Sequence, residues 1–162
     1  MSNAFKIGFG VTVVLIAFLV WRGFVATKGN HLEPIGKIGK VRAQKVDENE
    51  MVVVLDFNLK NSADLSMIVR SVEANIDEPD GSVIEGKILA AADLANVFRN
   101  YPDLGEQYNP PLKARDELKG HDEIDRMAGF RFDAPEDAVL KRKDIVLHIE
   151  DITGPVAELK AK

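Results

Sequence analysis

Apolar and polar side chains alternate most regularly between Met51 and Lys60. Every odd-numbered position of this run is apolar, and the even-numbered positions end in Asp56, Asn58 and Lys60. A period of two over this length predicts a strand with one buried face. A weaker alternation over 38–46 predicts a strand before it, and the polar run 47–50 predicts the turn between the two strands.

Alternation of the same kind predicts four more strands, over 65–77, 82–89, 123–134 and 144–152. In the first of these, Met67 and Val69 fall on the opposite face from Val72. We therefore expect a bulge or a change of sheet near Arg70. Pro79, Asp80 and Gly81 favour a tight turn before residue 82. The charged segment 112–118 is a candidate short edge strand.

The hydrophobic period changes once, at Leu94, Val97, Phe98 and Tyr101. These positions follow the i, i+3, i+4, i+7 spacing of an amphipathic helix, which we place at 91–100 with Pro102 ending it. About seven strands with turn signals between them, and one short helix, predict an all-β fold, an antiparallel β-sandwich.

The first thirty residues show neither the two-residue period of a strand nor the spacing of an amphipathic helix. Residues 7–21 carry no charge, and the apolar character continues past Arg22 to Thr27, which gives 21 residues. A membrane-spanning helix needs about 20 residues, and an arginine near its end can extend its guanidinium to the headgroups. We expect a single N-terminal transmembrane helix; its anchoring residues are Ile7, Val14, Leu15, Phe18, Trp21 and Arg22.

Two alternatives for this segment are a cleaved signal peptide and a buried helix of a soluble protein. Cleavage after Ala26 would place Phe24 at the −3 position, where a small residue is needed. The side of the membrane is a separate question, because Arg22, Lys28 and Lys37 after the span favour a cytoplasmic domain. The short leader is typical of signal anchors with an outward domain, so we expect the domain on the outer, extracytoplasmic side.

These patterns divide the chain into an anchor at 1–27, a stalk at 28–37, a sandwich domain at 38–155 and a flexible tail at 156–162. Residues 31–162 hold 18 basic and 26 acidic residues, a net charge of −8. A surface this acidic repels phosphate backbones, which excludes nucleic acid as a partner. The chain has no cysteine, so disulfides and thiol catalysis are excluded.

Two acidic segments are candidate metal sites. The first holds His121, Asp122, Glu123 and Asp125, which lack the fixed ligand spacing of a known motif. The second, 47–50, lacks the glycine of a calcium loop. We interpret both as solvated turns, and we interpret the basic cluster 141–143 in the same way. No nucleophile elbow and no phosphate-binding loop occurs, so we expect no catalytic residues, no metal and no cofactor.

The proline-bearing segment 103–111 is the candidate functional loop, because long surface loops often carry binding residues. Tyrosines on such loops are enriched where proteins meet. The predicted partner contacts are Tyr101, Tyr108, Pro110 and Pro111. The alternative is that Phe98 and Tyr101 only pack the helix onto the sandwich.

Several of these features together resemble a family. They are the apolar N-terminus, the strand that ends in Asn61 and Ser62, the strand pair around Asp80 and Gly81, and the late strand with Phe130 and Phe132. They resemble bacterial membrane-anchored immunoglobulin-like domains of the LEA14/FxLYD type, over about residues 38–153. The resemblance implies an immunoglobulin-like β-sandwich that binds or supports other molecules, without catalytic residues. The inserted helix at 91–100 departs from the family pattern.

Three functions follow from these predictions. The favoured one is a non-enzymatic, single-pass membrane protein that contacts lipid through its N-terminal helix and docks onto another envelope protein, or serves as an accessory subunit of a membrane complex. The second is a domain that binds or senses a small apolar ligand or lipid between its sheets. The third is a hydrolase with a site of unrecognised type within residues 102–125.

Overall fold

The computed structural model describes residues 34–161, which contain eight strands, two α-helices and one 3-10 helix. The strands are β1 (Pro34–Asp47), β2 (Glu50–Asn61), β3 (Met67–Asp77), β4 (Val83–Ile88), β5 (Glu117–Leu118), β6 (Glu123–Phe132), β7 (Asp144–Asp151) and β8 (Val156–Ala161). The helices are α2 (Ala91–Asn100), the 3-10 helix η1 (Pro102–Leu104) and α3 (Glu136–Leu140).

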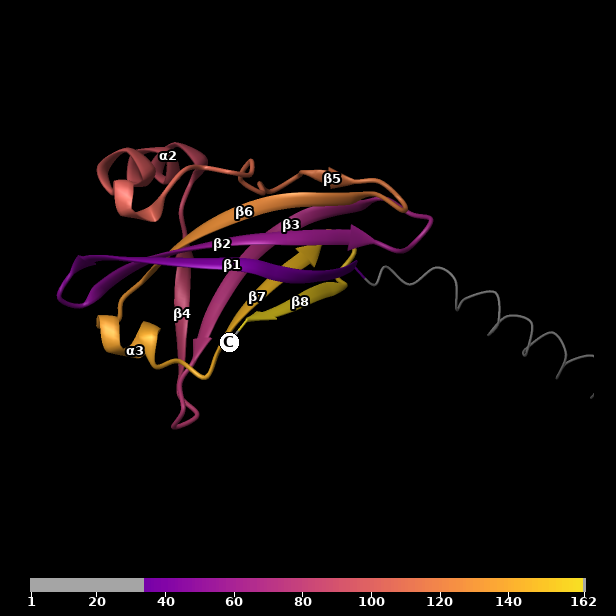
Figure 1. The fold of residues 1–162 in the computed structure, drawn as a ribbon. Helices are drawn as coiled ribbons and strands as arrows, with labels where there is room; N and C mark the ends of the chain where they lie inside the picture. The colour runs from indigo at the N-terminus through magenta and orange to yellow at the C-terminus, as the bar shows by residue number, and fades with distance from the viewer. Residues whose placement is uncertain (1–33, 162) are drawn as a thin grey trace, which may run out of the picture. The chain divides into compact units, whose positions relative to one another are not determined.

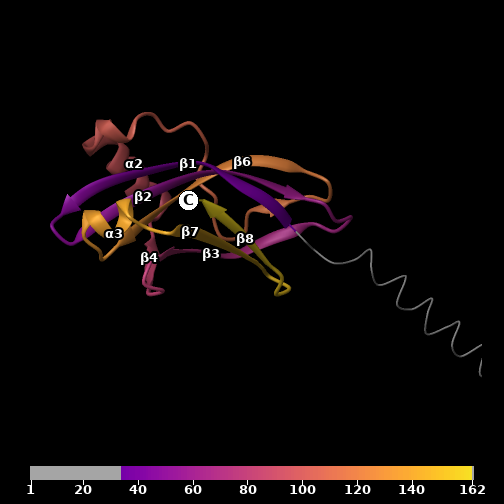
Figure 2. The ribbon, with the colours of Figure 1, turned by 60° about the horizontal axis from the view of Figure 1, so that its bottom comes forward.

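The strands form two layers that pack face to face (Figure 1, Figure 2). One layer contains β1, β2 and β6, and the other contains β3, β7 and β8, each strand antiparallel to its neighbour. Strand β4 joins the layers, because its first half pairs with β3 and its second half pairs with β6. The predicted antiparallel β-sandwich is therefore confirmed.

The main core lies between the layers and is built from the alternating residues of the predicted strands. Phe130 and Phe132 of β6 are fully buried, with ring centroids 6.4 Å apart. Ile145 and Leu147 of β7 are also fully buried and belong to the same cluster. The strands predicted over 123–134 and 144–152 are therefore present, and each turns a row of apolar side chains into the main core.

The expected irregularity near Arg70 is present. The pairing of β3 with β7 shifts register between Val69 and Ser71. Because of this shift, Met67 and Val69 enter the same core as Val72, although simple alternation would place them on opposite faces.

The prediction of one buried face for β2 is wrong. Val52 and Val54 occupy its outer face, yet both are fully buried. They belong to a second apolar cluster with Leu94 of α2 and Leu104 of η1. The outer face of β2 is apolar at these positions because α2 and η1 cover it.

Gly129 of β6 lets α2 lie close to the sheet. A Cβ atom at this position would lie 2.5 Å from Cδ1 of Leu94, which is too close for two carbon atoms. The absence of a side chain at residue 129 therefore makes room for Leu94, and α2 begins and ends at the predicted residues.

The predicted domain boundaries need two corrections. Residues 34–37, assigned to the stalk, pair with residues 58–61 of β2. The predicted flexible tail contains β8, in which Ala157 and Leu159 are buried. Short strands at the ends of a domain show too few alternating positions to stand out in the sequence. The predicted anchor residues Ile7, Val14, Leu15, Phe18, Trp21 and Arg22 lie outside the described residues. Within 34–161, no helix has the length and apolarity needed to span a membrane.

Two other elements differ from prediction. The edge strand expected over 112–118 is reduced to Glu117 and Leu118, which pair with β3. Helix α3 was not predicted, because five residues are too few to show a helical period. Its buried residue is Val139, which contributes to the main core.

The buried side chain of Asn61 braces the end of β2. Its amide nitrogen donates to the carbonyl oxygens of Leu65, Leu118 and Lys119 at 2.7, 3.2 and 3.2 Å. Its amide oxygen accepts from the Ala63 N–H at 3.0 Å. Asn61 thus ties the end of β2 to the β2–β3 connection and to β5.

Asp151 has a similar structural role at the end of β7, and it makes stability dependent on pH. Burial raises the pKa of its carboxyl, but hydrogen bonds from Thr153 and from the Ile68 N–H outweigh burial and hold the pKa below its ordinary value. A depressed carboxyl pKa contributes stability above the unfolded pKa of about 3.9, and this stability is lost as pH falls through the folded pKa.

We therefore expect the free energy of unfolding to decline below about pH 4, and Asp151→Asn to reduce this decline. Urea titrations at a series of pH values measure both effects. If the free energy of unfolding falls equally steeply with decreasing pH in the wild type and in the variant, this role of Asp151 is contradicted.

Candidate functional site

A buried ion pair lies on the outer face of the β1–β2–β6 layer. Nη2 of Arg42 lies 2.6 Å from Oδ2 of Asp56, and the two side chains are 5% and 10% exposed. Arg42 is opposite Val54 in the β1–β2 ladder, so Asp56 is its diagonal neighbour on the same face. The Nε of Arg42 is also buried and has no hydrogen-bond partner among the described residues. Removing both charges from water costs desolvation free energy. Stability alone therefore does not explain why this ion pair is buried.

The ion pair fixes the loop that follows α2. Nη1 of Arg42 donates to the carbonyl oxygens of Leu104 and Glu106 at 3.0 and 2.7 Å. The side-chain amide of Asn109 donates to Oδ1 of Asp56 at 3.1 Å. We call these contacts the Arg42 clamp; they tie the loop to the sheet at three points.

Two aromatic rings lie near the guanidinium of Arg42. Its Cζ atom is 4.9 Å from the ring centroid of Phe98 and 5.4 Å from that of Tyr108. The ammonium of Lys40 lies 5.2 Å from the Tyr108 centroid. Cations at such distances are attracted to aromatic faces. Tyr108 is nevertheless 59% exposed, so the clamp holds a large aromatic side chain in a fixed position at the surface.

The four predicted contact residues have different surroundings. Tyr108 and Pro110 are exposed, whereas Tyr101 is half-buried and packs against the second apolar cluster. Pro111 is half-buried and forms a bridge with Met127 of β6. Phe98 also packs against the second cluster, as the alternative interpretation expected. Tyr108 and Pro110 are therefore the accessible members of the predicted set.

A groove of about 520 Å³ lies beneath α2, between this helix and the strands that face it. Its apolar lining comes from β1, β2, β4 and α2, and its polar lining comes from Lys87 of β4, Arg131 of β6 and the α2 residues Asp93 and Asn96. Ile88, which also lines it, is 50% exposed. The accessible lining of this groove is more polar than apolar, as is common at the rim of protein–protein interfaces.

The acidic turn at 121–125 forms no metal site in the structure. His121 contacts Oδ1 of Asp64 at 2.8 Å, with both side chains exposed. Asp125 accepts a hydrogen bond from Asn58, and Glu123 lies 4.0 Å from Lys60. Among residues 34–161, no group of three or more histidine or acidic side chains is arranged to hold a metal ion.

The pairing of Arg42 with Asp56 was not among the sequence predictions. A regular hairpin around the turn at 47–50 would pair residue 42 with residue 55 and place Arg42 and Asp56 on opposite faces. The register shift between Lys45 and Asp47 brings the two side chains to the same face, and the sequence carries no signal for this shift. The link from Arg42 to Leu104 and Glu106 had no local signal, since these residues are more than sixty positions apart.

Comparison with known proteins gives little further information. No family model matches the chain, and no curated protein matches it. One structure with some similarity is an uncharacterised β-sandwich protein from Clostridium difficile 630, with 14% sequence identity, a TM-score of 0.32 and coverage of 82% of each chain. The sandwich described above therefore rests on the strand pairing of this chain itself.

Proposed function

We propose that this protein is a non-enzymatic, membrane-anchored β-sandwich that docks onto another protein of the cell envelope. The proposed docking surface consists of the loop 102–111, with Tyr108 at its centre, and the neighbouring groove beneath α2. The N-terminal apolar segment supplies the anchor in this proposal, with the sandwich on the outer side of the membrane.

The observation that carries the proposal is the Arg42 clamp. A loop that only covered Val52 and Val54 would need apolar contacts, which Leu104 already supplies. The clamp instead adds a costly buried ion pair and keeps Tyr108 exposed. Fixing a loop before binding lowers the entropy lost on association, and a rigid exposed tyrosine is a frequent contact residue.

The filling of the main core favours a surface partner over an apolar ligand between the sheets. Met51, Leu55, Phe130 and Phe132 extend into this space and are at most 2% exposed. A lipid between the layers would have to displace these side chains, which is costly in a close-packed interior.

We also propose that the sandwich is immunoglobulin-like. The strand order β1-β2-β6 in one layer and β3-β7-β8 in the other matches the A-B-E and C-F-G order of such domains. Strand β4 lies beside β6, where strand D would be. This order supports the resemblance to the LEA14/FxLYD type, from which helix α2 still departs.

Site-specific photocrosslinking in the cells that produce the protein tests the docking proposal. A photoreactive amino acid at position 108 or 88 should yield one discrete crosslinked protein species, because both positions lie on the proposed docking surface. The same amino acid at Ile152 is the matched control, since Ile152 is 58% exposed but lies in the β7–β8 connection.

The proposal predicts a crosslinked protein from positions 108 and 88 and none from position 152. Equal crosslinking from all three positions would indicate nonspecific contact. No crosslink from positions 108 and 88, together with lipid found bound to the purified chain by native mass spectrometry, would favour the apolar-ligand alternative.

A further inference from the structure

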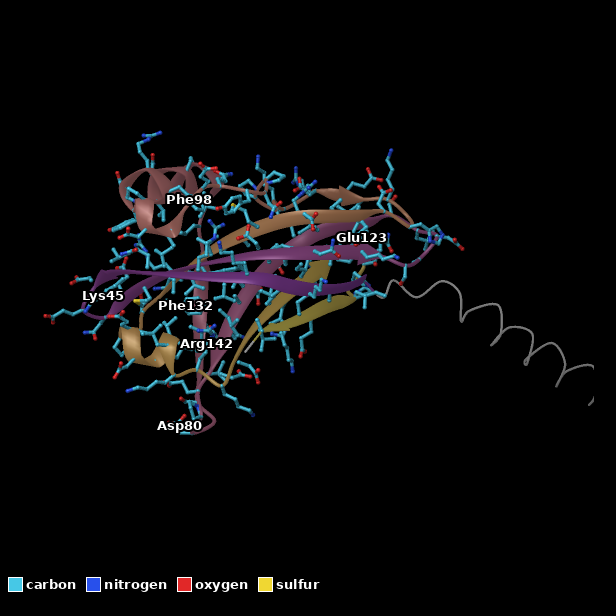
Figure 3. All side chains as sticks on the ribbon, in the orientation of Figure 1. Lys45, Asp80, Phe98, Glu123, Phe132 and Arg142 are labelled. Atoms are coloured by element: carbon cyan, nitrogen blue, oxygen red, sulfur yellow. The ribbon has the colours of Figure 1, made fainter. Side chains whose placement is uncertain are left out.

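Several large apolar side chains stay exposed at one end of the sandwich. Glu123, at the start of β6, marks this end in Figure 3, and Lys45 marks the opposite end. The exposed side chains are each more than half accessible to solvent, and they are Ile35, Leu65, Ile152 and Val156. Exposed apolar side chains that gather in one region usually mark an interaction surface.

Strand pairing and hydrogen bonds bring these positions to the same end. Ile35 is opposite Lys60 in the β1–β2 ladder, where β2 ends. Leu65 follows in the β2–β3 connection. The Ile152 N–H donates to the carbonyl oxygen of Ile68 at 2.9 Å, near the start of β3, and β8 begins directly after this β7–β8 connection. The two connections and the start of β1 therefore form one end of the domain.

Buried polar side chains fix the connections that carry Leu65 and Ile152. The side-chain amide of Asn61 donates to the carbonyl oxygen of Leu65 at 2.7 Å. The buried carboxylate of Asp151 accepts from the Thr153 N–H at 2.8 Å. A loop that is already fixed loses little conformational entropy when it contacts another surface. Leu65 and Ile152 are thus exposed on connections that are prepared for contact.

Charged side chains at this end have partners within the chain. Three pairs, with nitrogen–oxygen distances of 4.0, 3.1 and 2.8 Å, are Lys60 with Glu123, Arg70 with Glu150, and His121 with Asp64. An ionic partner would have to compete with these contacts, whereas an apolar environment would not. The surface therefore favours a partner that takes up aliphatic side chains.

The chain also enters the sandwich at this end. Strand β1 begins at Pro34, and the anchor predicted from the sequence ends at Thr27. An extended chain covers at most about 3.6 Å per residue, so Pro34 lies within about 25 Å of the end of that anchor. A short tether gives a high effective concentration, so a few apolar side chains suffice for contact with the membrane.

We propose that this end of the sandwich contacts the lipid surface, with Ile35, Leu65, Ile152 and Val156 in the boundary between headgroups and acyl chains. The inference rests on the anchor of the proposed function and adds a lipid contact made by the sandwich itself. Apolar groups of interfacial segments enter this boundary by about 5–10 Å. Helix α2 lies toward the opposite end (Figure 1), so the docking surface stays accessible to a protein partner.

Fluorescence quenching with the full chain in phosphatidylcholine vesicles tests this contact. The chain has no cysteine, so Leu65→Cys and Ile152→Cys each provide one site for an environment-sensitive fluorophore. Leu140→Cys is the matched control, because Leu140 is similarly exposed but lies on α3. The vesicles carry a spin label either near the headgroup or near the end of an acyl chain.

We expect the fluorophores at positions 65 and 152 to emit at shorter wavelength than the one at 140. The spin label near the headgroup should quench them more than the deep spin label does, since the contact is shallow. Neither spin label should quench the fluorophore at position 140. Quenching should persist at high salt, because apolar burial is not screened.

A fluorophore at Leu15→Cys separates this inference from the proposed anchor. If it is quenched by the deep spin label and positions 65 and 152 are not quenched, the lipid contact of the sandwich is overturned and the anchor stands. If it is not quenched, the anchor fails; quenching at 65 and 152 would then still support the lipid contact, and its absence would overturn both.

A charge at this end should disrupt the contact. Leu65→Asp places a carboxylate in the lipid boundary, which is unfavourable, so the fluorophore at position 152 should lose its quenching. Val83→Asp changes an equally exposed residue of β4 and should leave that quenching unchanged. Circular dichroism shows whether each variant folds. Unchanged quenching in a folded Leu65→Asp variant, or a discrete protein crosslinked from position 152, would overturn the proposal.

Discussion

Replacing Arg42 with alanine should destabilise the domain by about 3–5 kcal/mol, because the Asp56 carboxylate would stay buried without its cation. The carbonyl oxygens of Leu104 and Glu106 would also lose their donor. A urea titration of the full chain in mild detergent measures this loss as a lower midpoint with an unchanged slope.

Two controls separate the loss of the charge partner from a general effect of substitution. The double variant R42M/D56L removes both charges and should regain most of the stability, since apolar pairs of similar volume replace buried ion pairs at little cost. Lys87→Ala breaks the exposed pair with Asp133 and should leave the midpoint nearly unchanged. A midpoint for Arg42→Ala close to that of Lys87→Ala would contradict a buried, costly clamp.

Replacing Leu94 with alanine should cost about 2–5 kcal/mol, the usual range for a buried leucine. Leu94 is 1% exposed, and its Cδ1 atom fills the space above Gly129. The loss should be concentrated in α2 and η1, which share the second apolar cluster with β2. Hydrogen exchange should therefore accelerate in 91–104 more than in β7, and urea titration gives the total loss.

Leu140→Ala is the matched control for this substitution, since Leu140 is 61% exposed at the end of α3. It should shift the urea midpoint little, because an exposed leucine buries little additional area on folding. If hydrogen exchange in α2 is unchanged in the Leu94→Ala variant, contacts other than those of Leu94 hold this helix to the sheet.

Most of the sandwich could be predicted because its strands carry a local signal. Alternation identified β2, β6 and β7, and the change of period identified α2. The burial of both faces of β2 could not be predicted, since Val52 and Val54 are compatible with either an exposed or a covered outer face. What covers that face depends on contacts with Leu94 and Leu104, far along the chain.

The candidate site was predicted only in part, for the same reason. Tyr108 stood out as a tyrosine on a proline-bearing loop, and the structure places it at the surface. The contact of Arg42 with Asp56 depends on the register of β1 and β2, which shifts between Lys45 and Asp47. No short sequence motif indicates such a register. Contacts between side chains of different strands could therefore not be predicted.

In the proposed function, the Arg42 clamp prepares the Tyr108 loop for a protein partner. Photocrosslinking from position 108 in the R42M/D56L variant tests this role, because we expect that variant to keep the fold while it removes the contacts to Leu104 and Glu106. We expect the crosslink yield to fall to the level of the Ile152 control. A yield equal to that of the protein with an intact clamp would contradict it.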